Sequence, residues 1–186
     1  MHIEILWLDS VDSTNSEAKR RITELNSMSV IAARNQIAGR GQRTNKWFSE
    51  RDKSLTFSII LKEPDLKAWE QSAISEATAL AIVDALASYG IEAKIKWPND
   101  IFCGDRKICG ILIENSLMGE HIKCSIIGIG LNVNNTDFPT NLPNPTSMVL
   151  CSGCEYQIED VLNDLSDRLM VYLSELYRSR LRFDNR

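Results

Sequence analysis

Hydrophobic residues alternate with polar ones, or form short uninterrupted runs, in several segments of the chain. A period of two, and short apolar runs bounded by Gly, Pro, Asn or Asp, are typical of β-strands. The pattern predicts strands at residues 3–8, 29–35, 55–61, 93–97, 101–103, 106–115 and 122–133. Gly104 and Asp105 predict a hairpin turn between the fifth and sixth of these.

Other segments carry apolar residues at helical spacing or helix-boundary residues. The three predicted helices cover residues 14–25, 67–89 and 158–178. Polar residues at 12–15 offer N-caps, and Thr14 and Glu17 fit a capping box. Gly90 closes the second helix. Residues 37–53 and 134–153 are rich in Gly, Pro, Asn or basic side chains and predict loops.

These elements predict one α+β domain over residues 1–186, built on a mixed, largely antiparallel sheet. The three helices are expected to cover one face of that sheet. The order shows no strict alternation of strand and helix, no internal repeat and no linker.

Composition narrows the class of protein. The 186 residues are 44% hydrophobic and 25% charged, with 21 Lys and Arg against 25 Asp and Glu. No stretch approaches the roughly 18 apolar residues that a membrane-spanning helix needs. The formal net charge of -4 disfavours general nucleic-acid binding. Residues 34–53, however, carry six basic and two acidic side chains, which indicates a local anion site.

The five cysteines indicate reduced thiols in a cytoplasmic protein, because their number is odd and no export signal is visible. Cys151 and Cys154 have the spacing of a metal or redox pair, but a second pair of zinc ligands is absent. Two thiols in a turn are the simpler interpretation, and no residue is assigned as a metal ligand.

The basic loop at residues 39–47 is the first candidate binding motif. Gly39 and Gly41 let the backbone approach a ligand, and the basic side chains suit an anion. Trp47 offers a flat wall at the end of the loop. The spacing fits neither a Walker A loop nor the dinucleotide fingerprint. A solvated basic loop explains these residues equally well when they are taken alone.

Polar residues also follow or begin predicted strands. Asn99 and Asp100 come after Pro98, where a strand ends, although a simple turn has the same composition. Lys107 begins a strand that is apolar from its next residue onward, and a hairpin lysine is the simpler interpretation. Gly128 and Gly130 interrupt an apolar strand, which indicates a bulge or the close approach of a ligand or another backbone. Asn132 and Asn134 are expected on one face of that strand if it stays regular.

Taken together, the motifs resemble the signature series of bacterial biotin protein ligases. The resemblance rests on the series at residues 12–15, 36–41, 96–100, 107–114, 128–134 and 144–148. It implies the mixed-sheet fold shared with class II aminoacyl-tRNA synthetases. It also implies that biotin and ATP form biotinyl-5′-AMP, from which biotin passes to a lysine of the biotin carboxyl carrier protein of acetyl-CoA carboxylase. ATP would act with Mg²⁺.

The resemblance assigns roles residue by residue. Lys107, Arg40 and Asp100 would be catalytic, Asp100 by orienting or deprotonating the acceptor lysine. The residues implied for biotin are Ser13, Thr14, Asn15, Gln36, Arg40, Gly41, Gln42, Trp47, Lys107 and Gly110. Those implied for ATP and the adenylate are Arg43, Lys46, Asn99, Lys107 and Asn132.

The sequence also departs from the family pattern. The family loop commonly reads G-R-G-R-x-[GN]-R-x-W, and Gln42 and Asn45 stand where its second and third Arg are expected. Arg43 and Lys46, each one residue further on, could replace those phosphate contacts. Otherwise the adenylate would be held less firmly.

The resemblance covers a ligase catalytic domain, with neither an N-terminal helix-turn-helix domain nor a complete C-terminal SH3-like domain expected. DNA binding is therefore not expected, and a homodimer through a sheet edge is left open. A lipoate or octanoyl ligase is disfavoured, because its usual R-R-x-x-G-G-G loop is missing. A non-catalytic module that binds biotin or the carrier is a second alternative, and a nucleic-acid binder is the weakest.

Overall fold

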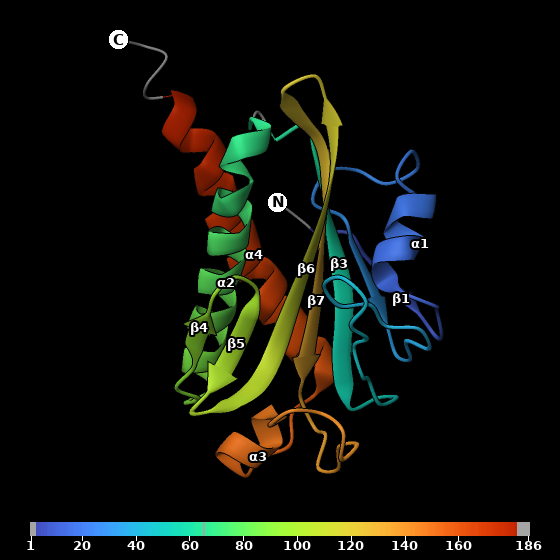
Figure 1. Ribbon diagram of the computed structural model, residues 1–186, viewed down its shortest axis with the longest axis vertical. Coiled ribbons are helices and arrows are strands. Elements are labelled where there is room, and N and C mark those ends of the chain that lie inside the picture. The colour runs from blue at the N-terminus through green and yellow to red at the C-terminus, as the bar shows by residue number, and fades with distance from the viewer. Residues whose placement is uncertain (1–2, 65, 182–186) are drawn as a thin grey trace.

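A computed structural model describes residues 3–64 and 66–181 and contains one seven-stranded sheet (Figure 1). The strand order is β1-β2-β3-β7-β6-β5-β4. Only β1 and β2 run parallel among these described strands, so the predicted mixed, largely antiparallel sheet is confirmed. The strands are β1 (Ile5–Leu8), β2 (Val30–Ala33), β3 (Ser54–Lys62), β4 (Lys94–Lys96), β5 (Asp100–Cys103), β6 (Arg106–Met118) and β7 (His121–Asn132).

The helices lie on both faces of the sheet (Figure 1), so the expectation of one covered face is wrong. They are α1 (Thr14–Arg20), α2 (Gln71–Ser88) after a short 3-10 turn η1 (Ala68–Glu70), α3 (Met148–Ser152) and α4 (Ile158–Leu181). In β3, Phe57 and Ile59 pack into the core under α2 and α4, whereas Ile60 packs with Ala18 of α1. Because successive side chains of a strand point to opposite faces, both faces of β3 are buried.

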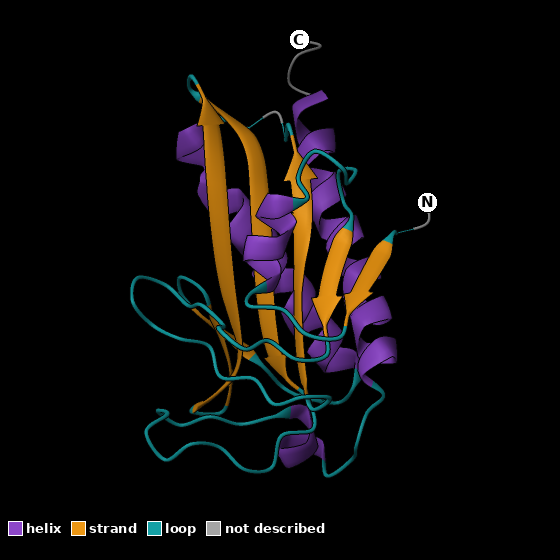
Figure 2. Ribbon diagram, turned by 90° about the vertical axis from the view of Figure 1, so that its right-hand side faces the viewer, coloured by secondary structure: helices purple, strands orange, loops and turns teal. Residues whose placement is uncertain are grey.

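The face that carries α1 is only partly covered by it. Ile60 of β3 and Ile126 of β7 form the small core under α1. Further along the same face, Ser58 lies beside Gly128, and Gly130 lies beside Gly110. Loops instead of helices lie over that part of the sheet, at one end of the molecule (Figure 2). The sheet therefore supplies a floor for a binding site there.

Most element boundaries agree with the sequence pattern to within a few residues. The second predicted helix ends at Ser88, and Gly90 follows with the left-handed backbone expected of it (φ 73°). α1 stops at Arg20, and the chain continues in turns that bring Leu25 into the core under α1. The predicted loop at 134–153 contains α3, whose first turn is capped by the Ser147 hydroxyl. No helix within the described ranges is long and apolar enough to cross a membrane.

Candidate functional site

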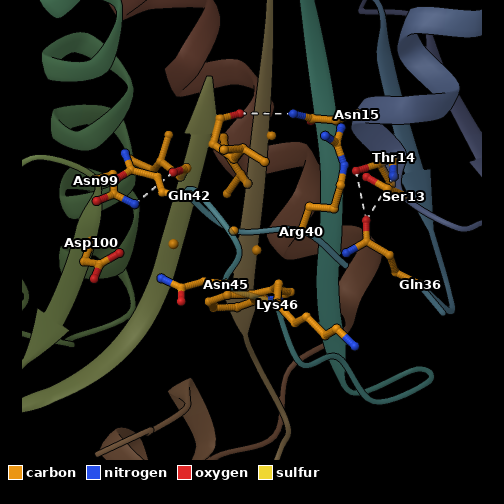
Figure 3. A pocket seen from close by; sticks show the side chains of 18 of the residues that line it. Ser13, Thr14, Asn15, Gln36, Arg40, Gln42, Asn45, Lys46, Asn99 and Asp100 are labelled. Carbon is orange, nitrogen blue, oxygen red and sulfur yellow. Dashed lines mark hydrogen bonds between the residues drawn. The ribbon is translucent and has the colours of Figure 1, made fainter. Parts of the chain in front are cut away.

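The loops at residues 36–53 and 134–147 meet the open part of the sheet and enclose two adjoining cavities. The first has a volume of about 150 Å³ and lies between the start of α1, strands β6 and β7, and the basic loop. Figure 3 shows Ser13, Thr14 and Gln36 on one side of it and Asn99 and Asp100 on the other. It is lined by Ser13, Thr14, Asn15, Gln36, Arg40, Gly41, Gln42, Asn45, Lys46, Trp47, Asn99, Asp100, Lys107, Gly110, Ile111, Leu112, Gly128, Ile129 and Gly130.

The Gln36 side chain binds the first residue of α1. Its Oε1 accepts a hydrogen bond from the backbone N–H of Thr14 at 2.9 Å and one from the Thr14 hydroxyl at 3.3 Å. An amide N–H at a helix start has no partner within the helix, so Gln36 takes the place of an N-cap. The predicted capping box is therefore wrong. Glu17 instead pairs with Arg20 and Arg21 on the outer side of the helix.

Buried hydroxyl and amide groups continue this network toward the sheet. The Ser58 hydroxyl on β3 lies 2.6 Å from Oδ1 of Asn15 and 2.8 Å from Oγ1 of Thr14. The Asn15 side-chain amide donates to the carbonyl of Leu112 at 3.2 Å and to Oε2 of Glu114 at 2.8 Å. These contacts fix the side chains before any ligand arrives, because buried polar groups need their partners.

Glu114 also holds the basic loop. Its two carboxylate oxygens accept hydrogen bonds from the Arg40 guanidinium at 3.1 and 2.7 Å. Burial raises the pKa of the Glu114 carboxyl, but the hydrogen bonds from Arg40 and Asn15 outweigh burial, so the pKa lies below its ordinary value. Glu114 is thus a carboxylate at neutral pH.

Three strand glycines make room for side chains above the sheet. The strand pairing around Gly128 and Gly130 is regular, so the expected bulge is absent. A Cβ at Gly128 would lie 2.9 Å from Cγ of Asn15, and one at Gly130 would lie 2.5 Å from Nε1 of Trp47. At Gly110 it would lie 2.9 Å from Cζ3 of the same indole. The close approach that the glycines predict is therefore made by side chains of this chain.

Lys107 lies where the two cavities join. Its Nζ is 2.6 Å from Oδ1 of Asp100 and 5.5 Å from the centre of the Trp47 ring. The backbone N–H of Lys107 donates to the carbonyl of Asn144, and its carbonyl accepts from the N–H of Thr146. These bonds fix the second loop against β6. The indole N–H of Trp47 is buried against Gly130 and has no hydrogen-bond partner among the described residues.

The second cavity is larger, about 370 Å³, and more apolar in its lining. It shares Asn45, Lys46, Trp47 and Lys107 with the first, and adds Phe48, Asn132, Phe138, Asn141, Leu142, Pro143 and Pro145. Asn132 is buried at the end of β7, and its side-chain amide donates to the carbonyl of Thr146 at 2.8 Å. Aromatic and proline surfaces beside an asparagine suit a flat heterocycle that also needs hydrogen bonds.

The positive charge of residues 34–53 is largely paired with carboxylates. Arg34, Arg40, Arg51 and Lys53 each form an ion pair. Arg43 and Lys46 have no such partner among the described residues. Lys46 lines both cavities. Arg43 is exposed in a turn with a left-handed backbone (φ 57°) and lines neither.

The structure thus gathers all the sequence-predicted site residues except Arg43 around the two cavities. Asn99, expected at the adenylate, lines the first cavity, and its amide donates to the carbonyl of Ile111 at 3.2 Å. Asn134 is turned to Tyr156 instead of the cavities. Sequence reasoning gave no role to Ser58, Glu114 or the second cavity's apolar wall. A serine inside the apolar run of β3 is the signal that would have marked Ser58.

The cysteines and a metal site can be assessed within the same described ranges. All five cysteines are unpaired and none lines either cavity. Burial, and a hydrogen bond with Cys151, raise the pKa of Cys103 to about 11. The described part of the chain contains no cluster of three or more His, Cys, Asp or Glu side chains that could hold a metal ion. Asp100 is the single carboxylate among the described cavity-lining residues.

Comparison with solved structures defines the class of fold. The chain superposes on the biotin protein ligase of Aquifex aeolicus, solved in complex with biotin and ATP, with a TM-score of 0.80 at 27% identity. That match covers 94% of this chain and 72% of the other. The match to the Leishmania major biotin protein ligase in complex with biotinyl-5-AMP has a TM-score of 0.74 at 25% identity, and covers 94% of this chain and 76% of that one. The chain belongs to the biotin/lipoate A/B protein ligase family, whose model matches residues 7–132.

Two curated relatives agree with this assignment. The chain is 36% identical over 129 residues to the biotin--[acetyl-CoA-carboxylase] ligase of Paracoccus denitrificans, a match over 68% of this chain and 53% of that protein. It is 34% identical over 155 residues to the bifunctional ligase/repressor BirA of Bacillus spizizenii, over 80% of this chain and 47% of the relative. The chain spans about half the length of these relatives, so its expected domain limits stay a prediction.

Proposed function

We propose that this chain catalyses the ATP-dependent attachment of biotin to a lysine of a carrier protein, through biotinyl-5′-AMP. The observation that carries the proposal is the junction of the two cavities at Lys107 and Trp47. A reaction that joins two small molecules needs two adjoining sites and a positive charge between them. Membership of the ligase family and the biotin and ATP bound by the Aquifex aeolicus relative support it.

Biotin is assigned to the first cavity. Its ureido ring has N–H donors and a carbonyl acceptor, and the polar network of Ser13, Thr14, Asn15 and Gln36 offers both kinds of partner. The apolar valeryl chain would lie along Trp47, whose indole packs over Gly110. Arg40, Gly41 and Gln42 of the basic loop would cover the ligand.

ATP is assigned to the second cavity. The adenine ring would lie among Phe138, Pro143 and Asn132, and Lys46 would meet the phosphates. Mg²⁺ would supply charge neutralisation to the triphosphate. Since the described residues offer one cavity carboxylate, Asp100, the ion would be held mainly by phosphate oxygens and water, which is a common arrangement for Mg²⁺.

Lys107 is proposed to serve the first chemical step. A biotin carboxylate oxygen attacks the α-phosphorus, the bond to the β-phosphate oxygen breaks, and pyrophosphate leaves. Both reacting groups are anions, so an ammonium between them reduces their repulsion and stabilises the charge that develops on phosphorus. The 2.6 Å contact with Asp100 fixes the position of that ammonium.

Asp100 is proposed to serve the second step. The amine of the acceptor lysine attacks the acyl carbon of the adenylate, the bond to the phosphate oxygen breaks, and AMP leaves. The amine must lose protons on the way, and Asp100 lies at the cavity wall as a carboxylate that could accept one. We expect Asp100→Asn to slow transfer from preformed adenylate. Slowed adenylate formation with intact transfer would instead remove this role.

The proposed partner is the biotin carboxyl carrier protein of acetyl-CoA carboxylase, because the Paracoccus denitrificans relative is a ligase for that enzyme. The proposed compartment is the cytoplasm, which five unpaired thiols support.

One assay tests the function. The protein is incubated with Mg-ATP, labelled biotin and a purified carrier domain, with lipoate in a parallel reaction. ATP-dependent label on the carrier is expected from biotin alone. Adenylate without transfer would indicate a half-reaction enzyme. Biotin binding without ATP use would overturn the proposal in favour of a binding module, and transfer of lipoate would reassign the substrate.

A further inference from the structure

We propose that Glu114 is a positioning residue that joins the Arg40 loop to Asn15 and thereby selects ligands with an N–H donor at the end of the first cavity. The inference rests on the proposed function, because it explains how the cavity would distinguish the ureido group of biotin. Nothing in the signature motifs gives Glu114 a task.

The contacts of Asn15 carry the first step. A side-chain amide has two N–H donors and one carbonyl acceptor. Both donors of Asn15 are engaged on the sheet side, by the Leu112 carbonyl at 3.2 Å and by Glu114 at 2.8 Å. The amide is therefore held in one of its two orientations, with Oδ1 beside the Ser58 hydroxyl. A ligand that meets Asn15 then finds an acceptor, so it must bring a donor.

Glu114 enforces that orientation because an ionised carboxylate can only accept hydrogen bonds. A flipped Asn15 would place Oδ1 against two groups that can only accept, the Glu114 carboxylate and the Leu112 carbonyl. Such a mismatch is unfavourable in a buried site. The lowered pKa of Glu114 keeps the carboxyl ionised over the range in which an enzyme works.

The same carboxylate receives the Arg40 guanidinium through two hydrogen bonds, at 3.1 and 2.7 Å. Two parallel bonds fix the geometry of an Arg–carboxylate pair as well as its distance. Arg40 belongs to the loop that covers the first cavity, and Asn15 belongs to α1 beneath it. Glu114 thus makes the position of the loop and the orientation of Asn15 depend on each other.

Two variants of Glu114 test these contacts. In Glu114→Ala both contacts are lost, and the Kd for biotin should rise at least tenfold, equivalent to about 1.4 kcal/mol. In Glu114→Gln an acceptor for Asn15 is retained while the charge is lost, and a rise of about threefold is expected, since neutral hydrogen bonds are weaker than charge-assisted ones. The KM for ATP should stay within twofold in both, because Asn15 and Arg40, the partners of Glu114, line the first cavity and not the second.

Glu159→Gln is the matched control. Glu159 pairs with Arg34 at 2.7 Å, and the two side chains are 42% and 41% exposed, close to the 36% and 44% of Glu114 and Arg40. Neither Glu159 nor Arg34 lines a cavity. This variant should change the free energy of unfolding as much as Glu114→Gln does, but leave biotin binding unchanged.

The coupling is measured with Asn15→Ala and Arg40→Ala, alone and together, by titration calorimetry with biotin. Their effects should be non-additive with Glu114 present and additive in Glu114→Ala, since only coupled residues deviate from additivity. Additive effects in both backgrounds, or an unchanged Kd in Glu114→Ala, would overturn this proposal while the ligase function stands. A wild-type chain that binds no biotin would overturn the proposed function itself.

Discussion

The two cavities are built in different ways. The first lies on strands and the start of α1, and its polar side chains already bond one another through Gln36, Ser58 and Glu114. The second is walled mostly by loop residues at 45–48 and 138–145, with Phe48 and Pro143 among its apolar surfaces. The first cavity therefore rests on regular elements with a loop over it, whereas the second is enclosed mostly by loops.

This difference indicates how each ligand is recognised. Side chains that are fixed before binding lose little entropy when the ligand arrives, and they discriminate by donor and acceptor. Loop walls must be ordered by the ligand and by the few bonds that hold them, such as the contact of Asn132 with Thr146. Lys107 lines both cavities, so its substitution should affect both ligands and gives the strongest test of this comparison.

Lys107→Met should have the largest effect, because it removes the charge shared by the two cavities and leaves Asp100 without its ion-pair partner. Loss of one electrostatic stabiliser reduces kcat by about 10²–10³. Adenylate formation, followed by pyrophosphate release, should fall by that factor. Lys94→Met is the control, since Lys94 is exposed on β4 and lines neither cavity. An equal loss in both variants would contradict the shared role.

Gly128→Ala should damage the first cavity alone. Its methyl group would overlap Asn15, and overpacking of this kind costs about 1–3 kcal/mol of stability. The KM for biotin should rise about tenfold, which corresponds to about 1.4 kcal/mol, while the KM for ATP stays constant. Adding Asn15→Ala should restore the thermal midpoint and leave biotin binding weak. Rescue of binding by the second change would show that Asn15 does not contact the ligand.

Asn132→Ala should damage the second cavity alone. The Thr146 carbonyl would lose its partner, at a cost of about 1–3 kcal/mol, and the loop wall would loosen. The KM for ATP should rise several-fold with biotin affinity unchanged, as initial rates would show. Asn134→Ala is the control, because Asn134 makes comparable bonds to Tyr156 away from both cavities. A similar rise in the KM for ATP in Asn134→Ala would show that Asn132 contributes only to stability.

Replacing a cation of the basic loop should have a smaller effect, which is faster release of the adenylate. Lys46 lines both cavities and Arg43 lines neither, so Lys46→Ala should speed adenylate release more than Arg43→Ala does. A few-fold change is expected, because exposed charges contribute about 1 kcal/mol or less. Single-turnover release measures both rates. The opposite order would mean that the loop shifts when the ligand is bound.

A moderate fall in pH below neutrality should have the smallest effect, and it concerns the stability of the fold. A hydrogen bond from Arg20 lowers the pKa of Asp12 to about 2, and one from Arg21 lowers that of Glu17. Carboxyls with lowered pKa values stabilise the fold above their ordinary pKa, and this stabilisation is lost as the pH falls through the lowered value. The thermal midpoint should therefore hold above about pH 5 and decline toward pH 2. Asp12→Asn should flatten that decline, and an unchanged slope would contradict the assignment.

Much of the fold could be predicted from the sequence because the sheet strands keep a period of two or a short apolar run. The placement of α1 on the second face could not. The second face of β3 carries Thr56, Ser58 and Ile60, so the strand sequence there does not predict a covering helix, and only the packing of Ile60 against Ala18 shows that α1 lies on it. α3 was missed because a five-residue helix lacks a full apolar period.

The family resemblance places Lys107 and Asp100 at the site, and both line the first cavity, although their roles stay predictions. The sequence predicted less where tertiary contacts redirect a side chain. Thr14 looked like a helix cap because its spacing to Glu17 is right, but Gln36 reaches the helix from another loop. Arg43 looked like a phosphate ligand, but the left-handed turn places it outside both cavities. Such contacts join residues that are distant in sequence, which a local pattern does not record.

The pairing of β3 with β7 has a consequence for how the site comes into being. Ser54 pairs with Asn132, so the centre of the sheet joins distant parts of the chain, whereas β6 and β7 form a local hairpin. Pairings between distant segments form slowly, because the loop between them must first be closed. β7 lies between the β3 floor with Ser58 and the β6 edge with Lys107. A chain still emerging from the ribosome therefore cannot form the first cavity until β7 is made.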